Sequence, residues 1–158
     1  MQLQRVCHDT PAVAYLFLVR PITHMQTEIF TLCDSATNDR GKLNILGSFD
    51  SIYARQFPCD HHMCAIACKL RFDIGEDGQH TLEITFSDPD MRPVLDPIRS
   101  EFTIDMGDNL SHTHIHTHHY VGFHLERPGE YYFELRVDGE TRSRIPLYVV
   151  HLQQQPPV

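Results

Sequence analysis

The 158-residue chain is 41% hydrophobic and 22% charged, values that are typical of one globular domain and exclude a disordered or fibrous chain. Its formal net charge is −8 with histidine neutral, and no cluster of lysine and arginine occurs anywhere in it. Because nucleic acid and anionic membrane surfaces both require a basic patch, the sequence predicts that neither is a partner.

The first 24 residues contain a short apolar stretch, AVAYLFLVR at 12–20, which resembles the core of a signal peptide. No small-x-small cleavage site follows, because Arg20 is followed directly by Pro21, and the stretch is too short to span a bilayer. A more regular pattern begins at Met25. We therefore expect residues 1–24 to be an N-terminal extension upstream of the true start at Met25. The alternative is that they add a strand or helix to the domain.

From Met25 onward, apolar and polar residues alternate in short runs separated by turn residues, which predicts strands rather than helices. Gly47 inside the second run predicts a bulge or bend, and Asp138-Gly139 suits a type I′ turn. The expected strands are residues 27–36, 43–57, 63–72, 80–88, 101–106, the histidine-rich run described below, and the two arms of a hairpin at 127–150. The pattern predicts a single antiparallel β-sandwich of about seven to nine strands over residues 25–150, followed by a polar tail at 151–158.

The stretch that leads into the last hairpin resembles the penultimate strand of immunoglobulin-like domains. The resemblance is carried by Leu125, Pro128, Gly129, Tyr131 and Phe133. In those domains a tyrosine near the start of the strand hydrogen-bonds back to a neighbouring loop. The resemblance therefore implies an immunoglobulin-like sandwich and assigns this role to Tyr131.

Most of the chain also resembles a family of small, uncharacterised bacterial proteins that is defined only as a domain of unknown function. The resemblance spans about residues 25–150 and is carried by GKLNILGSFDSIYA (41–54) and PGEYYFELRVDG (128–139). It implies a natural start at Met25 and a cytoplasmic product, and it implies no activity or catalytic residue. The histidine-rich run is not part of this resemblance.

The run SHTHIHTHHY at 111–120 is the stretch most suggestive of chemistry. Side chains two residues apart in a strand share a face, which here groups His112, His114, His116 and His118 into a row. Because Ile115, Val121 and Phe123 fall on the opposite face, we expect that face to be the core face and the histidine row to face solvent. His119 breaks the pattern, so we expect it to be buried or to mark a bulge.

A metal site in this run would use His114, His116 and His118 as ligands for zinc or copper. A single ion cannot collect the whole row, because the four histidines span about 20 Å at about 3.3 Å per residue. An adjacent pair would need a further ligand from a neighbouring strand, such as His61, His62 or His80, or an acid. The alternatives are a solvated histidine-rich face with no cofactor, and an acid response in which the protonated imidazoles repel one another.

The five cysteines are Cys7, Cys33, Cys59, Cys64 and Cys68. Their odd number and irregular spacing favour reduced thiols in a cytoplasm. Cys64 and Cys68 alternate with Ile66, so we expect both to pack in the core. Cys59, with His61 and His62 in the same predicted loop, remains an open candidate for metal ligation.

No nucleophile elbow, phosphate loop or calcium loop occurs in the sequence, and Asp88, Asp90 and Asp96 are expected to bond their own turn backbone. The favoured hypothesis is a non-enzymatic binding module whose partner is another protein or a second copy of the chain. Its candidate surfaces are the segments 58–63 and 88–97 and the histidine face. The second hypothesis is a metal-binding protein that uses the histidine row. The third is a hydrolase-type enzyme whose carboxylates converge only in space.

Overall fold

The structure is a computed structural model that describes residues 25–152, so the predictions for residues 1–24 and for the end of the tail lie outside it. All regular structure in the described residues is strand, and this part of the chain contains no helix that could cross a membrane. The strands are β1 (Gln26–Asp39), β2 (Lys42–Phe49), β3 (Ser51–Ala54), β4 (Cys59–Asp73), β5 (Gly78–Ser87), β6 (Ile98–Ile104), β7 (Ser111–Leu125), β8 (Gly129–Val137) and β9 (Glu140–His151). The all-β prediction is confirmed.

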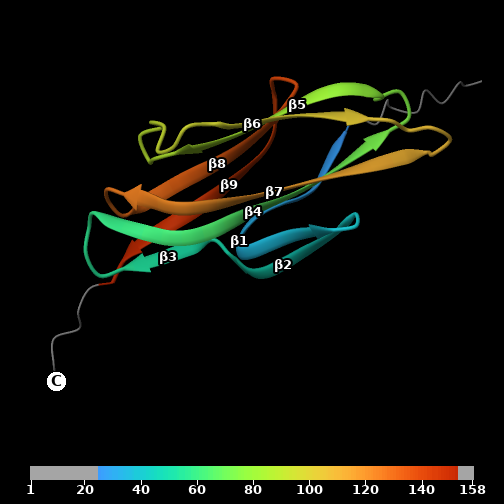
Figure 1. Cartoon of the computed structure of the whole chain (residues 1–158). Coiled ribbons are helices and arrows are strands. Elements are labelled where there is room, and N and C mark those ends of the chain that lie inside the picture. The colour runs from blue at the N-terminus through green and yellow to red at the C-terminus, as the bar shows by residue number, and fades with distance from the viewer. Residues whose placement is uncertain (1–24, 153–158) are drawn as a thin grey trace, which may run out of the picture.

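The strands form two sheets that pack face to face (Figure 1). One sheet has the order β2-β1-β4-β7 and the other has the order β3-β9-β8-β5-β6. Neighbouring strands are antiparallel, except that β3 runs parallel to β9. The prediction of a two-sheet, sandwich-like fold is confirmed, and the prediction that it is antiparallel throughout is wrong for this one pair.

The single strand expected at 43–57 is two strands that belong to different sheets. β2 pairs with β1 in the first sheet, whereas β3 pairs with β9 in the second. The chain crosses between the sheets at Asp50, whose carbonyl accepts a hydrogen bond from the N–H of Tyr148 at 2.7 Å. Gly47 has a φ of 64°, in the left-handed region that glycine tolerates, and β2 keeps the same register with β1 on both sides of it, so the strand has no bulge there.

The core lies between the sheets and follows the predicted alternation. β4 contributes Cys64, Ile66, Cys68, Leu70 and Phe72, each at most 1% exposed. From the facing sheet, Phe86 and Phe133 stack with 4.1 Å between their ring centroids. The core positions predicted for Cys64 and Cys68 are therefore confirmed, and every cysteine in the described residues is a free thiol.

The hairpin of β8 and β9 also follows its prediction. Asp138 and Gly139 have φ values of 52° and 80°, and positive values at both positions are what a type I′ turn requires. Tyr131 at the start of β8 is buried, and its hydroxyl donates a hydrogen bond to the carbonyl of Arg127 at 2.9 Å. Tyr131 thus ties the preceding loop to the core, as the resemblance implied.

One side of the sandwich is left open between β6 and β7. Each is an outer strand of its own sheet, and within the described residues no backbone pairing joins them. Phe102 of β6 stacks on His114 of β7 with 3.7 Å between ring centroids, so the two strands lie next to each other (Figure 1). We call the zone between the inner faces of β6 and β7 the seam.

Candidate functional site

The histidine row faces the seam. β7 pairs with β4 along its whole length, and directly opposite residues in such a pair share a face. His112, His114, His116 and His118 lie opposite Phe72, Leu70, Cys68 and Ile66, respectively. Because those β4 side chains are buried in the core, the prediction that the row lies on the solvent face is wrong.

Gly122 explains why the alternation pointed the other way. It has a φ of 65°, and the inward positions of β7 change there from Tyr120 to Phe123, although the register with β4 stays the same. Val121, which the pattern assigned to the core, is 81% exposed. His119 is exposed on the outer face opposite Ala65, so it is neither buried nor the site of a register shift.

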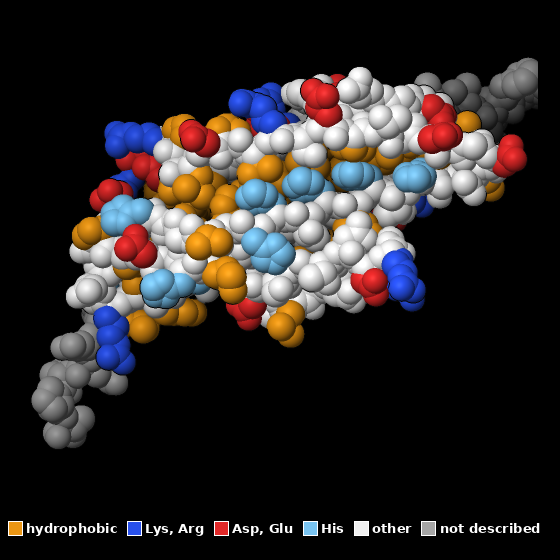
Figure 2. Space-filling model, in the orientation of Figure 1, with side chains coloured by type: hydrophobic (Ala, Val, Ile, Leu, Met, Phe, Trp, Pro, Cys, Tyr) orange, Lys and Arg blue, Asp and Glu red, His pale blue; other side chains and the backbone are white. Residues whose placement is uncertain are grey.

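Aromatic rings pack around His114 in the seam. Its imidazole lies nearly parallel to the ring of Phe102, at an interplanar angle of 12°. His80 stacks against Phe102 at 5.6 Å, and Phe72 meets Phe102 edge-on at 5.8 Å. Figure 2 shows the resulting line of histidine side chains on this side of the molecule, with hydrophobic side chains beside it. His114 therefore contributes to packing between the two sheets.

Burial in the seam favours the neutral form of three histidines in the row. Burial lowers the pKa of His114 from the ordinary 6.5 to about 4, with further lowering by His116, His112 and His80. Burial also lowers the pKa values of His116 and His118, and in each case a neighbouring histidine acts in the same direction. The Nε2 atoms of His114 and His116 are enclosed without a hydrogen-bond partner in the described residues, so a proton added there would find no acceptor.

His80, on β5, differs from His114, His116 and His118 because its pKa is raised rather than lowered. Burial lowers its pKa, but a hydrogen bond from Nδ1 to Asp138 at 2.7 Å and one from Nε2 to the carbonyl of Glu76 at 3.0 Å outweigh burial and raise it. The first contact ties β5 to the turn between β8 and β9, and the second ties it to the turn between β4 and β5. They also occupy both ring nitrogens of a residue predicted as a cross-strand metal ligand.

The predicted ligands His114, His116 and His118 are not gathered into a metal-ligand set. Among residues 25–152, no group of three or more His, Cys, Asp or Glu side chains is placed to hold a metal ion. His61 packs against Phe49 and Phe123, and its Nε2 is enclosed as well. Binding of zinc or copper by the row therefore stays a prediction. One equivalent of metal in untagged protein purified without nickel would support it.

A second polar cluster, which sequence reasoning missed, lies at the end of β7. Nδ1 of His124 is 2.7 Å from the carboxylate of Asp60, and its Nε2 is 3.5 Å from that of Glu126. His124 and Glu126 line a hollow of about 670 Å³ together with the ion pair of Asp90 and Arg127. A histidine oriented by a carboxylate suits general-base chemistry, but the described lining holds no serine, threonine or cysteine nucleophile. Only the register of β4 with β7 could have revealed the His124–Asp60 pair.

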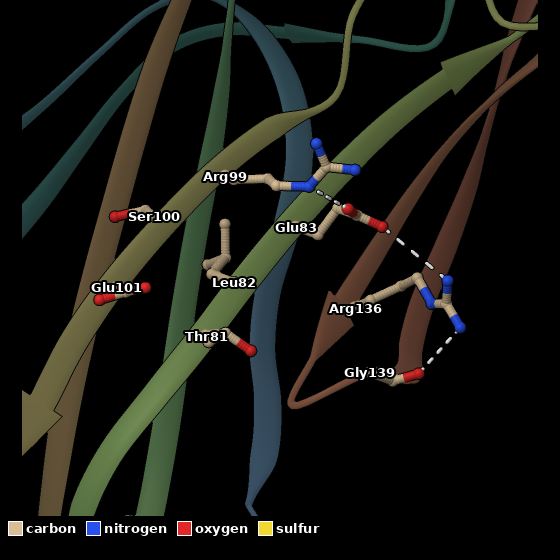
Figure 3. Close-up of a pocket in the computed structure, with 8 residues that line it drawn as sticks. All are labelled: Thr81, Leu82, Glu83, Arg99, Ser100, Glu101, Arg136 and Gly139. Carbon is tan, nitrogen blue, oxygen red and sulfur yellow. Dashed lines mark hydrogen bonds and ion pairs between the residues drawn. The ribbon is translucent and has the colours of Figure 1, made fainter.

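Another hollow, of about 400 Å³, lies on the outer face of the second sheet (Figure 3). Arg99 and Arg136 approach Glu83 from the two neighbouring strands, at 2.6 and 3.8 Å. Arg136 also donates a hydrogen bond to the carbonyl of Gly139 at 2.8 Å. Because these charges satisfy one another, we interpret the hollow as a ladder of surface ion pairs rather than as a binding site.

Only one of the two predicted loop surfaces is a loop. Residues 59–63 form the start of β4, so the loop expected at 58–63 is wrong. The segment 88–97 contains the expected turn, in which Asp88 accepts hydrogen bonds from the N–H groups of Asp90 and Arg92, both at 2.8 Å. Asp90 departs from its prediction, because its side chain forms an ion pair with Arg127.

We predict that acidification destabilises the protein through the seam. Because the folded-state pKa values of His114, His116 and His118 are lowered, the unfolded chain takes up protons first as pH falls. Stability present at pH 7 is therefore lost as pH falls below about 6.5 toward the folded-state pKa values, and His80, whose pKa is raised, offsets part of the loss. The His114→Gln variant should lose about 2 kcal/mol less unfolding free energy than the wild type between about pH 7 and pH 5.

Urea unfolding at a series of pH values measures this effect. The matched control is His119→Gln, which makes the same chemical change at an exposed position on the outer face of the same strand. The control should keep most of the pH dependence of the wild type, because burial, and not His119, is the main cause of the lowered pKa of His118. An equal pH dependence in wild type and His114→Gln would show that the seam does not hold His114 neutral.

Two solved structures align with most of this chain at low identity and low TM-score. The crystal structure of a β-glucosidase from Listeria innocua in complex with isofagomine has a TM-score of 0.48 at 8% identity, covering 82% of this chain and 16% of that one. The Pseudomonas fluorescens alkylpurine DNA glycosylase AlkC, bound to DNA containing an abasic site analog, has a TM-score of 0.43 at 8% identity, covering 80% of this chain and 30% of that one. This chain thus spans less than a third of either protein chain.

No curated protein matches the sequence. A family described as "Family of unknown function (DUF6941)" matches residues 28–150, which include all of β2 to β8 and most of β1 and β9. The match agrees with the family resemblance found in the sequence. The chain belongs to this family of unknown function.

Proposed function

We propose that the protein is a non-enzymatic interaction module that binds a protein partner along the free edge of β7. The observation that supports the proposal is the composition of this strand, since Ser111–Leu125 contains no lysine, arginine, aspartate, glutamate or proline. Within residues 25–152, no strand pairs with the outer edge of β7. Such an edge offers unpaired N–H and C=O groups to which a further strand can be added.

The other three outer strands carry features that discourage pairing. β3 has only four residues. β6 carries the exposed charged residues Arg99 and Glu101. β2 begins with Lys42 and has only eight residues. Short length and charge are among the usual means by which proteins protect a sheet edge, and β7 is the longest of the four outer strands and carries no charged residue.

Exposed apolar side chains accompany the edge of β7. Val121 is 81% exposed, and Met63, directly opposite on β4, is 56% exposed. Leu110, immediately before the other end of β7, is 78% exposed. A single exposed apolar residue is ordinary, but apolar side chains at both ends of an unpaired strand favour contact with another protein.

We also propose the immunoglobulin-like class for the sandwich and a cytoplasmic location for the protein. The hydrogen bond from Tyr131 to the loop before β8 supports the first proposal. The free thiols of Cys33, Cys59, Cys64 and Cys68 support the second, because reduced cysteines are usual in reducing compartments.

Site-specific photo-crosslinking in the native host tests the proposed binding edge. A photoreactive amino acid at Val121 should capture a protein, because this side chain lies exposed on the edge strand. The control position is Leu46, where the same photoreactive amino acid should capture less protein. Leu46 is 69% exposed on β2, the other outer strand of the same sheet. Equal capture at the two positions, or no capture at either, would contradict the proposal.

A further inference from the structure

We propose that the outer face of β3, β9 and β8 binds a proline-rich segment of another protein that carries an acidic residue at one end. This contact lies on the second sheet and is separate from the free edge of β7 in the first sheet. Its basis is a line of three tyrosines, Tyr53, Tyr148 and Tyr132, that ends at the guanidinium group of Arg144. We call these four side chains the tyrosine row.

Strand pairing arranges the three tyrosines in a line. β3 runs parallel to β9 and places Tyr53 opposite Val150, two residues after Tyr148. β8 runs antiparallel to β9 and places Tyr132 opposite Pro146, two residues before Tyr148. Diagonal neighbours of this kind are about 7–8 Å apart, so the line crosses three strands over about 15 Å. The parallel pairing of β3 is what keeps the line straight, because an antiparallel β3 would direct Tyr53 toward the same side as Tyr132.

The three tyrosines share the outer face of the sheet. Side chains alternate between the two faces of a strand, and the immediate neighbours of the tyrosines point into the core. These neighbours are Ile52, Tyr131, Phe133, Leu147 and Val149. The tyrosines therefore point away from the core.

The tyrosine row is the centre of an exposed apolar patch. Tyr53 is 62% exposed and Tyr148 is 42% exposed. Val150 and Leu152, at the end of β9 beside them, are 38% and 43% exposed. Single exposed apolar side chains are ordinary, but a contiguous group of them is typical of a contact with another molecule. Tyrosine and arginine are also the residues that often carry most of the binding energy of a protein interface.

The backbone beneath the row is already paired. Tyr148 lies opposite Ser51 of β3 on one side and opposite Glu130 of β8 on the other, so no further strand can be added there. A partner is therefore recognised by side chains. A polyproline II segment suits such a surface, because its prolines pack on aromatic rings and its carbonyl oxygens, which have no internal hydrogen bonds, can accept from phenol groups.

The spacing of the row is close to the repeat of a polyproline II helix. This helix has three residues per turn and rises about 3.1 Å per residue, so every third residue returns to the same side after about 9 Å. Neighbouring tyrosines are about 7–8 Å apart. Successive turns of the helix can therefore meet Tyr53 and then Tyr148.

Arg144 supplies a positive charge at the end of the row. Its guanidinium carbon lies 3.8 Å from the ring centroid of Tyr132, and its Nη2 donates a hydrogen bond to Sδ of Met91 at 3.0 Å. In the part of the chain that the structure describes, no carboxylate forms an ion pair with Arg144. Glu134, directly opposite in register, instead accepts a hydrogen bond from Thr141 at 3.2 Å. An acidic residue of the partner would supply the counter-charge.

A small apolar hollow adjoins Arg144. Its volume is about 220 Å³, and its lining includes Met91, Pro93, Leu95 and Pro97. Small-molecule sites usually measure about 300–1,000 Å³, so this hollow suits a single aliphatic side chain next to the acidic residue. The distance from the level of Tyr53 to that of Arg144 is about 20 Å along β9, which about seven residues of polyproline II helix would span.

An NMR titration of the full chain with a synthetic peptide tests the proposal. The probe is six prolines followed by glutamate and leucine, and the reversed sequence is a second probe, because a polyproline II helix presents similar ridges in both directions. One of the two should shift the amide signals of β3, β8 and β9, and not those of β7, with a Kd of about 10–100 μM. The same peptide with lysine in place of glutamate should bind about fivefold more weakly, because it would meet the charge of Arg144.

Variants of the row locate the contact. Tyr53→Ala and Tyr148→Ala should each weaken binding at least about tenfold, because each removes one ring of the row. Arg144→Gln should abolish the preference for glutamate over lysine. The matched control is Leu46→Ala, at an exposed apolar position on the other sheet, which should leave the Kd unchanged. Unfolding midpoints of all four variants check that the fold is retained.

Several outcomes would overturn the proposal. They are no binding of either peptide up to about 5 mM, shifts confined to β7, equal binding of the glutamate and lysine peptides, and equal weakening by Tyr148→Ala and Leu46→Ala. Shifts at the row that grow with protein concentration alone would identify a second copy as the occupant, and binding of cellohexaose in place of the peptides would identify a carbohydrate. The photo-crosslinking result at Val121 is independent of all these outcomes, so the proposed function can fail or hold separately.

Discussion

The pairing of β7 with β4 determines the environment of the histidines in this protein. One register runs from Cys59 opposite Leu125 to Asp73 opposite Ser111, without a shift. Because directly opposite residues share a face, the core position of Leu70 places His114 on the inner side of the sheet. The stack of His114 on Phe102 and the preference of its imidazole for the neutral form both follow from that placement.

Histidine suits the open side of the sandwich because positions there are only partly buried. A leucine at position 114 would pack well but would leave apolar surface at the margin, and a lysine would bring a charge that is costly to bury. A neutral imidazole packs its ring against Phe102 without bringing a charge into the seam. The same neutrality leaves β7 without the charges that Arg99 and Glu101 supply to β6. Packing in the seam and an unprotected edge are thus two consequences of one sequence feature.

Local patterns were sufficient to predict most of the strands and the last hairpin, because alternation and turn chemistry depend on neighbouring residues. The role of Tyr131 was implied instead by the resemblance to immunoglobulin-like domains. The local patterns were not sufficient to predict which face of β7 is buried. Gly122 reverses the alternation, so Val121 and Phe123, which the pattern placed together, lie on opposite faces. The crossing of the chain between sheets at Asp50 also depends on strands that are distant in sequence, and alternation carries no information about them.

The position of His114 can be measured directly by following its imidazole nitrogens in NMR spectra over a pH titration. Placement in the seam predicts that the ring stays neutral well below its ordinary pKa of 6.5 and becomes protonated only near pH 4. Protonation close to 6.5 would be the behaviour of an imidazole in contact with water. That result would contradict the inward orientation of the histidine row.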